Sequence, residues 1–226
     1  MQSEDGNRRC LILANGTPPG KKAINYFSMQ GFDYLICADG GANSAFRLGL
    51  TPGLIIGDLD SIKPEVYDYY QRKVKIIKYK RQNDTDVEKA LKYVISKGYG
   101  EVILCGATGD RLDHSFCNVG VLLKFYNQIR VYLYHDKSIA YVISGLNFIK
   151  TIKGETISIY GIEPRTKFTS RGLKYPLEKV ALPFGSREST SNIALTGNLE
   201  LSVSRGKGII MRDFITVVKH GLLFNN

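Results

Sequence analysis

Short apolar runs recur at regular intervals along the first 135 residues, and this spacing is the strongest constraint on the fold. Their centres lie about 20 to 28 residues apart, which suits a strand, a crossover helix and the next parallel strand. The runs are apolar throughout and do not alternate, which is typical of strands covered on both faces. The six runs are Cys10–Ala14, Tyr34–Ala38, Leu54–Ile56, Val74–Ile77, Val102–Cys105 and Ile129–Tyr134.

Amphipathic stretches between these runs predict helices. Apolar residues recur at helical spacing within Thr85–Lys97, and Thr85 with Glu88 forms a T-x-x-E capping box at its start. The stretches Pro64–Arg72 and Leu112–Gln128 are further predicted helices. Strands and helices that alternate in this way predict an α/β domain built on an open, mostly parallel sheet of about six strands.

After about residue 136 the pattern changes to short segments rich in β-branched residues, separated by Gly or Pro. This pattern predicts an all-β domain. We therefore expect two domains, an α/β domain over residues 1–140 and an all-β domain over residues 141–226. The predicted strands of the second domain are Thr156–Tyr160, Lys167–Ser170, Leu199–Val203 and Ile215–Val218.

The chain carries a net charge of +10, which favours an anionic partner such as nucleic acid, a membrane surface or a polyphosphate. The polar segment 1–9 lacks the apolar core of a signal peptide, and no apolar run has the length of a membrane-spanning helix. Cys10, Cys37 and Cys105 lie in apolar runs and are predicted to be buried free thiols. We therefore expect a cytoplasmic protein without a membrane partner.

Acidic residues follow four successive strands of the predicted sheet, at the carboxyl ends where open α/β sheets bind ligands. In a basic protein this concentration indicates a site for a hard cation, and Mg²⁺ is usually held by one or two carboxylates plus substrate phosphate oxygens. Any one of these Asp residues alone is typical of a turn or of a helix N-terminus. The four loops are Asp39–Asn43, Gly57–Ser61, Gln82–Asp86 and Gly106–His114.

Basic residues flank the acidic loops. Lys80 and Arg81 lead into the third loop, and Arg111 lies inside the fourth. Such side chains would neutralise the triphosphate charge that a divalent ion leaves uncompensated. The sequence has neither the GxGxxG nor the GxxxxGK[ST] pattern, so neither the usual dinucleotide fold nor a P-loop is supported.

Taken together, the ordered motifs resemble the thiamine pyrophosphokinase family. They are Asp39-Gly40-Gly41-Ala42-Asn43, Gly57-Asp58-Leu59-Asp60-Ser61, Asn83-Asp84-Thr85-Asp86 and Gly109-Asp110-Arg111-Leu112-Asp113-His114. The resemblance covers residues 10–135 well and is thinner in the second half, where it includes Thr190-Ser191-Asn192. It implies an enzyme that transfers the terminal diphosphate of ATP to the hydroxyl of thiamine, giving thiamine diphosphate and AMP.

The same resemblance implies an α/β ATP-binding catalytic domain, a β-sandwich-like thiamine-binding domain, Mg²⁺, and a homodimer whose thiamine pocket is shared between subunits. It implies that Asp58, Asp60, Asp86 and Asp113 are catalytic, and that the first three also hold Mg²⁺. The ATP-binding residues would be Asp39, Lys80, Asn83, Thr85 and Arg111. The thiamine-binding residues would be Asp113, Ser191 and Asn192. Some family members place a Trp beside the thiamine ring, and this chain has no Trp.

Three other functions compete with this one. A different Mg²⁺-dependent kinase or diphosphokinase acting on another small alcohol would use the same residues, and its product, ADP or AMP, separates the two reactions. A nucleic-acid binder would fit the positive charge, yet no known binding module is visible and the acidic loops argue against it. A thiamine-binding protein without catalysis would not need the complete set of acids.

Overall fold

The computed structural model describes residues 8–79, 83–109 and 111–224. The chain divides into two compact units, Met1–Asp136 and Lys137–Asn226. Among the described residues no helix is both long and apolar enough to cross a membrane. Each unit has a core of its own, so the two are described separately.

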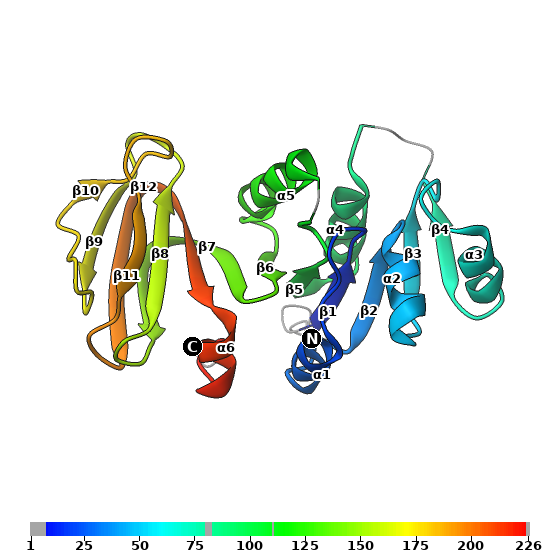
Figure 1. Ribbon diagram of the computed structural model, residues 1–226. Helices are drawn as coiled ribbons and strands as arrows, with labels where there is room; N and C mark the ends of the chain where they lie inside the picture. The colour runs from blue at the N-terminus through cyan, green and yellow to red at the C-terminus, as the bar shows by residue number, and fades with distance from the viewer. Residues whose placement is uncertain (1–7, 80–82, 110, 225–226) are drawn as a thin grey trace, which may run out of the picture. The chain divides into compact units, whose positions relative to one another are not determined.

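The first unit is built on a parallel sheet with strand order β6-β5-β1-β2-β3-β4 (Figure 1). Each neighbouring pair in it runs parallel, which confirms the predicted sheet. Ile12, Ile36, Ile55 and Ile103 are fully buried in the strands, as expected for a sheet covered on both faces. The strands are β1 (Arg8–Leu13), β2 (Tyr34–Ala38), β3 (Leu54–Gly57), β4 (Lys75–Lys78), β5 (Tyr99–Cys105) and β6 (Arg130–His135).

Helices connect these strands, and α4 packs against β2 and β3. The predicted capping box is present at its start, where the Thr85 hydroxyl accepts from the Glu88 amide and the Glu88 carboxylate accepts from the Thr85 amide. The three predicted helices therefore form, although each ends one to three residues earlier than expected. The helices are α1 (Lys21–Met29), α2 (Gly41–Leu48), α3 (Pro64–Tyr70), α4 (Asp86–Ser96) and α5 (Leu112–Phe125).

The strand order reverses between β1 and β5, the place where open α/β sheets commonly bind ligands. Here the loops after these two strands are joined by backbone hydrogen bonds, from Gly16 N to Gly106 O at 2.6 Å and from Thr17 N to Thr108 O at 2.8 Å. A Cβ on Gly16 would lie 2.4 Å from the Thr108 carbonyl oxygen. Protein backbone thus occupies this point. Three of the four acidic loops lie farther along the sheet, after β2, β3 and β4, and the fourth, Gly106–His114, follows β5.

The second unit is an antiparallel β structure in which the long strand β12 pairs with three others (Figure 1). Its first half pairs with β9 and its second half with β8, while β7 pairs along both halves across a register shift. This arrangement encloses a core that includes Phe168, Ile159 and Leu201. The strands are β7 (Ser138–Lys150), β8 (Thr156–Gly161), β9 (Lys167–Arg171), β10 (Val180–Ala181), β11 (Ser189–Ile193) and β12 (Asn198–Asp213).

One predicted strand is wrong. The segment Ile215–Val218 lies in the helix α6 (Phe214–Lys219), despite its β-branched residues. Asp213 caps this helix by accepting from the Thr216 amide at 2.7 Å. Phe214 and Val217, three residues apart, are both buried. The cap and this buried face therefore outweigh the strand propensity of the segment.

Candidate active site

Three carboxylates from two adjacent loops meet at the carboxyl edge of the parallel sheet. Asp39 follows β2, and Asp58 and Asp60 follow β3; each offers one oxygen, and these oxygens all lie within 4.8 Å of one another. Asn43 joins the two loops, donating to the Ser61 carbonyl at 2.8 Å and accepting from the Lys63 amide at 3.0 Å. A cluster of carboxylate oxygens has the donor chemistry that Mg²⁺ and other hard cations require.

Asp39 is the buried member of this cluster, with 4% of its surface exposed. Its Oδ1 atom has no hydrogen-bond partner among the described residues. Burial raises the pKa of this carboxyl, as do the nearby Asp86 and Asp58, while hydrogen bonds from Ser61 and the Gly40 backbone oppose the rise. A buried carboxylate oxygen without a partner costs free energy in the protein alone, and a bound cation would offset that cost.

Two backbone features bring the carboxylates together. A Cβ on Gly57 would lie 2.8 Å from the Asp39 Cβ and 3.1 Å from the Asp86 Oδ1, so only glycine leaves room for both side chains. Leu59 has a φ of 67°, a left-handed conformation that is uncommon for its residue type. This turn separates Asp58 from Asp60, and the Asp60 amide donates to Asp58 Oδ1 at 3.3 Å.

A buried lysine joins the acids at the start of α4. The Lys89 Nζ atom lies 2.7 Å from Asp86 Oδ1 and 3.7 Å from Asp58 Oδ2, and its side chain is only 5% exposed. Burial lowers the pKa of Lys89, but the hydrogen bond to Asp86 and the charges of Asp86, Asp58 and Asp39 outweigh it and raise the pKa above its ordinary value. Lys89 is therefore a fixed positive charge within the cluster.

The other residues predicted for ATP lie outside the three-carboxylate group. Asn83 and Thr85 are exposed at the start of α4, where the Thr85 hydroxyl serves as the helix cap. Arg111 precedes α5 and donates to both oxygens of Asp113, at 3.2 and 2.5 Å. The hydrogen bond from Arg111 is the main reason that the pKa of Asp113 falls to about 2. Lys80 lies outside the described residues.

In the second unit, the two residues predicted for thiamine differ in exposure. Asn192 is 1% exposed and clamps the backbone of Tyr175, accepting from its amide at 3.1 Å and donating to its carbonyl at 2.8 Å. Ser191 is exposed with a φ of 55°, within an irregularity of β11, and its amide donates to the Ser158 hydroxyl at 3.0 Å. Asn192 therefore holds the segment in place, while the Ser191 side chain faces solvent.

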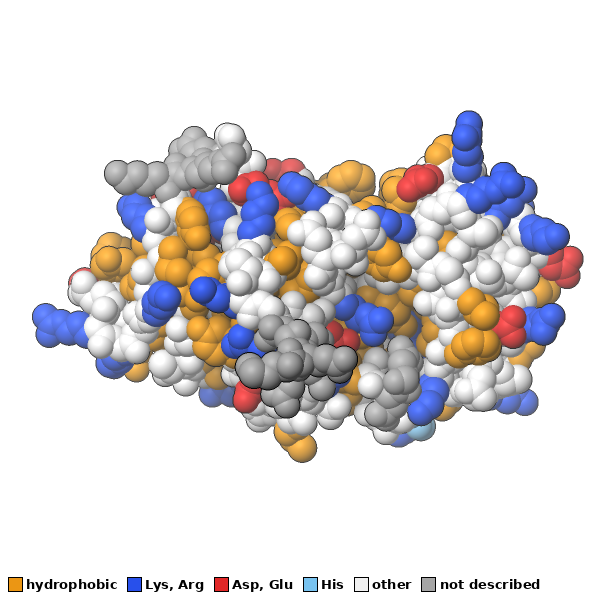
Figure 2. Space-filling model, turned by 180° about the vertical axis from the view of Figure 1, so that it is seen from behind, with side chains coloured by type: hydrophobic (Ala, Val, Ile, Leu, Met, Phe, Trp, Pro, Cys, Tyr) orange, Lys and Arg blue, Asp and Glu red, His pale blue; other side chains and the backbone are white. Residues whose placement is uncertain are grey.

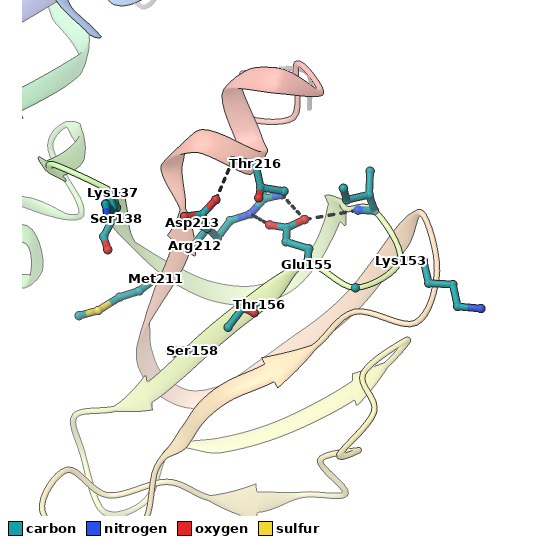
Figure 3. Close-up of a pocket in the computed structure, with 12 residues that line it drawn as sticks. Lys137, Ser138, Lys153, Glu155, Thr156, Ser158, Met211, Arg212, Asp213 and Thr216 are labelled. Carbon is teal, nitrogen blue, oxygen red and sulfur yellow. Dashed lines mark hydrogen bonds and ion pairs between the residues drawn. The ribbon is translucent and has the colours of Figure 1, made fainter. Parts of the chain in front are cut away.

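A cavity of about 510 Å³ lies in the second unit beside β8, β12 and α6 (Figure 3). Its wall contains the buried pair of Arg212 and Glu155, joined by contacts of 2.6 and 3.0 Å. Arg212 also donates to the carbonyls of Lys150 and Leu222. Ser158 lines the same cavity, so the cavity reaches the strand next to Ser191.

Sequence reasoning missed Lys89 and the Arg212–Glu155 pair. The signal for Lys89 was its position three residues after Asp86 on a predicted helix, where the two side chains share a face. Nothing in the sequence indicated that Arg212 and Glu155, 57 residues apart, would meet. The free thiols were predicted correctly, since Cys10, Cys37 and Cys105 are buried and unpaired.

A parallel α/β sheet that gathers carboxylates at the carboxyl ends of its strands has the architecture of an enzyme acting on phosphorylated substrates. Comparison with known proteins gives the family. Residues 28–133 match the thiamin pyrophosphokinase catalytic domain, and residues 145–210 match the thiamin pyrophosphokinase vitamin B1 binding domain. The chain belongs to the thiamine pyrophosphokinase family.

Relatives and solved structures agree with this result. Thiamine pyrophosphokinase 2 of Oryza sativa subsp. japonica is 30% identical over 187 residues, covering 70% of each chain. Thiamin pyrophosphokinase 1 of Caenorhabditis elegans is 25% identical and covers 89% of this chain and 88% of its own. The structure of thiamin pyrophosphokinase from Candida albicans superposes with a TM-score of 0.81 at 19% identity, covering 92% of this chain and 90% of its own.

The fold and activity predicted from the sequence are therefore confirmed. The chain is a transferase that carries out ATP-dependent diphosphate transfer to thiamine, forming thiamine diphosphate. It has an α/β catalytic unit followed by a β-rich unit.

Proposed function

We propose that Asp39, Asp58 and Asp60 hold Mg²⁺ together with the triphosphate of ATP. The observation that carries this proposal is the buried Asp39 Oδ1, which lacks a partner among the described residues and belongs to a group of three convergent carboxylates. Bound there, Mg²⁺ would neutralise part of the charge on the triphosphate. Asp86 was also assigned to the metal from the sequence. In this proposal Asp86 lies beside the three carboxylates and pairs with Lys89 instead of binding the ion.

The side chains of this chain then align and stabilise the reactants. The hydroxyl oxygen of thiamine attacks the β-phosphorus, the bond from that phosphorus to the α-phosphate oxygen breaks, and AMP leaves. We propose that Asn83, Thr85, Lys80 and Arg111 contact the nucleotide. The hydroxyl proton passes to a carboxylate of the cluster or to water, and alignment with charge stabilisation supplies most of the rate.

Asp113, Ser191 and Asn192 are proposed to bind thiamine, with Asn192 holding its neighbour Ser191 in place through its bonds to Tyr175. The left-handed backbone at Ser191 supports this role, because such conformations persist where surrounding contacts impose them, and they cluster at binding sites. The cavity beside Ser158 gives room next to this strand.

We propose that the chain forms a homodimer with a thiamine pocket shared between the subunits. Its support is the apolar surface around Asp113, where Leu112 is 80% exposed and Phe116 is 67% exposed. Large apolar side chains left in contact with water on the helix that carries a substrate residue are typical of a surface that a partner covers. Sedimentation equilibrium of the wild-type chain and of a variant with Leu112→Ser and Phe116→Ser would test it, and a wild-type monomer would contradict it.

We also propose a cytoplasmic location and no nucleic-acid partner. All four cysteines are free thiols, which suits a reducing compartment. On the face that Figure 2 shows, Lys and Arg side chains are scattered among other side chains and do not gather in one stripe. The net charge of +10 favours encounter with an anion such as ATP.

The direct test is incubation with ATP, Mg²⁺ and thiamine, followed by separation of the products. Formation of thiamine diphosphate and AMP in equal amounts is expected, whereas ADP would indicate transfer of a single phosphate. Asp58→Asn and Asp60→Asn should each lower turnover at saturating Mg²⁺ by about 100-fold or more. Asp68→Asn, on the exposed surface of α3, is the matched control. Near-normal turnover in both cluster variants would remove the metal-site proposal.

A further inference from the structure

The acidic cluster of the first unit contains more negative charge than one divalent ion neutralises. Asp86 lies beside the group formed by Asp39, Asp58 and Asp60, and it adds to the charges that raise the pKa of Asp39. Four carboxylates at one edge of a sheet repel one another, most strongly where they are shielded from water. Something in the protein must offset this repulsion before any ligand arrives.

Lys89 is placed to do so. Its ammonium lies at hydrogen-bond distance from Asp86 Oδ1 and within 4 Å of Asp58 Oδ2, and its side chain is 95% buried. A buried ammonium is costly unless it is paired and hydrogen-bonded, so its presence here requires these partners. By contrast, Lys92 on the same helix is half exposed and pairs with Asp84.

The contacts divide the cluster into two cation positions. One is the group of Asp39, Asp58 and Asp60, where the Asp39 Oδ1 has no partner among the described residues. The other lies between Asp58 and Asp86, and the Lys89 ammonium fills it. Asp58 is common to both positions.

We infer that Lys89 is a built-in cation that occupies the position a second divalent ion would take, so that the free protein binds one divalent ion at Asp39, Asp58 and Asp60. Lys89 is thus a positioning residue: it holds Asp86 and Asp58 and touches no reacting atom. The inference deepens the metal-site proposal above and depends on it.

Removing this charge should strengthen metal binding, which is the reverse of what loss of a merely structural residue would do. In Lys89→Met, Asp86 is freed to bind metal and a unit positive charge near the ion is lost. We expect the affinity of the nucleotide-free protein for Mn²⁺, measured by isothermal titration and by electron paramagnetic resonance, to rise at least about tenfold. Lys89→Arg keeps the charge and should leave the affinity near that of the wild type.

Two further variants make the test decisive. Lys92→Met is the matched control and should not change the Mn²⁺ affinity. The double variant Lys89→Met with Asp86→Asn removes the freed carboxylate and should return the affinity toward the wild-type value. If Lys89→Met does not fold, the double variant and Lys89→Gln are titrated in its place, with tighter binding expected only where Asp86 is intact.

An unchanged or weaker Mn²⁺ affinity in the folded Lys89 variant overturns the inference. So does a failure of both the wild type and the Lys89 variant to bind Mn²⁺. Wild-type turnover, measured in the same preparations with and without Mg²⁺, tells the two proposals apart. If turnover depends on Mg²⁺ and falls in Asp58→Asn, the metal site stands and only the role of Lys89 fails. If turnover is independent of Mg²⁺ or unchanged in Asp58→Asn, the metal-site proposal fails as well.

Discussion

Both units of this protein bury polar groups, but only the first leaves a buried side-chain oxygen without a partner among the described residues. In the second unit, Arg212 and Glu155 satisfy each other, and Asn192 satisfies the backbone of Tyr175. In the first unit, Asp39 keeps an oxygen without a partner among the described residues. Buried polar groups are almost always hydrogen-bonded, so this exception is the observation that supports the proposed metal site. The contrast separates residues that stabilise the fold from the carboxylate that we propose binds the metal.

The largest expected effect concerns the satisfied pair of the second unit. Arg212→Met leaves Glu155, which is 2% exposed, as an uncompensated buried charge. We expect the free energy of unfolding to fall by about 3–5 kcal/mol, measured by urea denaturation. The double variant Arg212→Met with Glu155→Leu should recover most of this loss, because it removes both charges. An equal loss in the double variant would show that the uncompensated charge of Glu155 is not the cause.

The next prediction concerns Asp39 in the first unit, where one substitution should lower activity and raise stability. Asp39→Asn removes a proposed metal ligand and should lower turnover by about 100-fold. Because burial already raises the pKa of Asp39 and disfavours its charged form, the neutral amide should raise the free energy of unfolding by about 1 kcal/mol. Turnover and thermal unfolding of the same preparation check both. A variant that is less stable and fully active would show that Asp39 serves the fold.

Asn192 was assigned to thiamine from the sequence, whereas the structure gives it partners within the second unit. Asn192→Ala leaves the amide and the carbonyl of Tyr175 without these partners. The expected loss of stability is about 2 kcal/mol, measured by urea denaturation. Ser191→Ala, whose side chain is exposed, should leave stability unchanged and raise the KM for thiamine. Equal stability of both variants would contradict the assignment of Asn192 to the fold.

The smallest effect concerns the exposed pair of Arg111 and Asp113. The hydrogen bond from Arg111 lowers the pKa of Asp113 from 3.8 to about 2. Since the folded value lies below the unfolded one, the pair adds stability above pH 4, and that contribution is lost as the pH falls toward 2. NMR titration of the Asp113 carboxyl should give the low pKa, and Arg111→Ala should return it to the ordinary range. The same low pKa in both proteins would exclude Arg111 as the cause.

Sequence patterns predicted the parts of this fold that depend on local and periodic signals. The six parallel strands followed from the spacing of apolar runs, and the start of α4 from the pair Thr85 and Glu88. The segment Ile215–Val218 was mistaken for a strand because the cap from Asp213 and the burial of Phe214 and Val217 depend on how α6 packs.

Part of the candidate active site could also be predicted from the sequence. Strand order places Asp39, Asp58 and Asp60 at one edge, so their convergence could be expected from the chain alone. The unpartnered oxygen of Asp39 and the burial of Lys89 could not, because both depend on which neighbouring atoms fill the surrounding space. The approach of Asp39 to Asp86 likewise depends on the missing side chain at Gly57.

The central claim is that Asp39, Asp58 and Asp60 hold the metal ion that accompanies ATP. The most direct measurement is anomalous X-ray diffraction from crystals grown with Mn²⁺ and ATP. We predict a single manganese peak within about 2.5 Å of carboxylate oxygens of Asp39 and of at least one of Asp58 and Asp60. ATP bound without manganese at these residues, or a peak on other side chains with the Asp39 oxygen still unpartnered, would contradict the account.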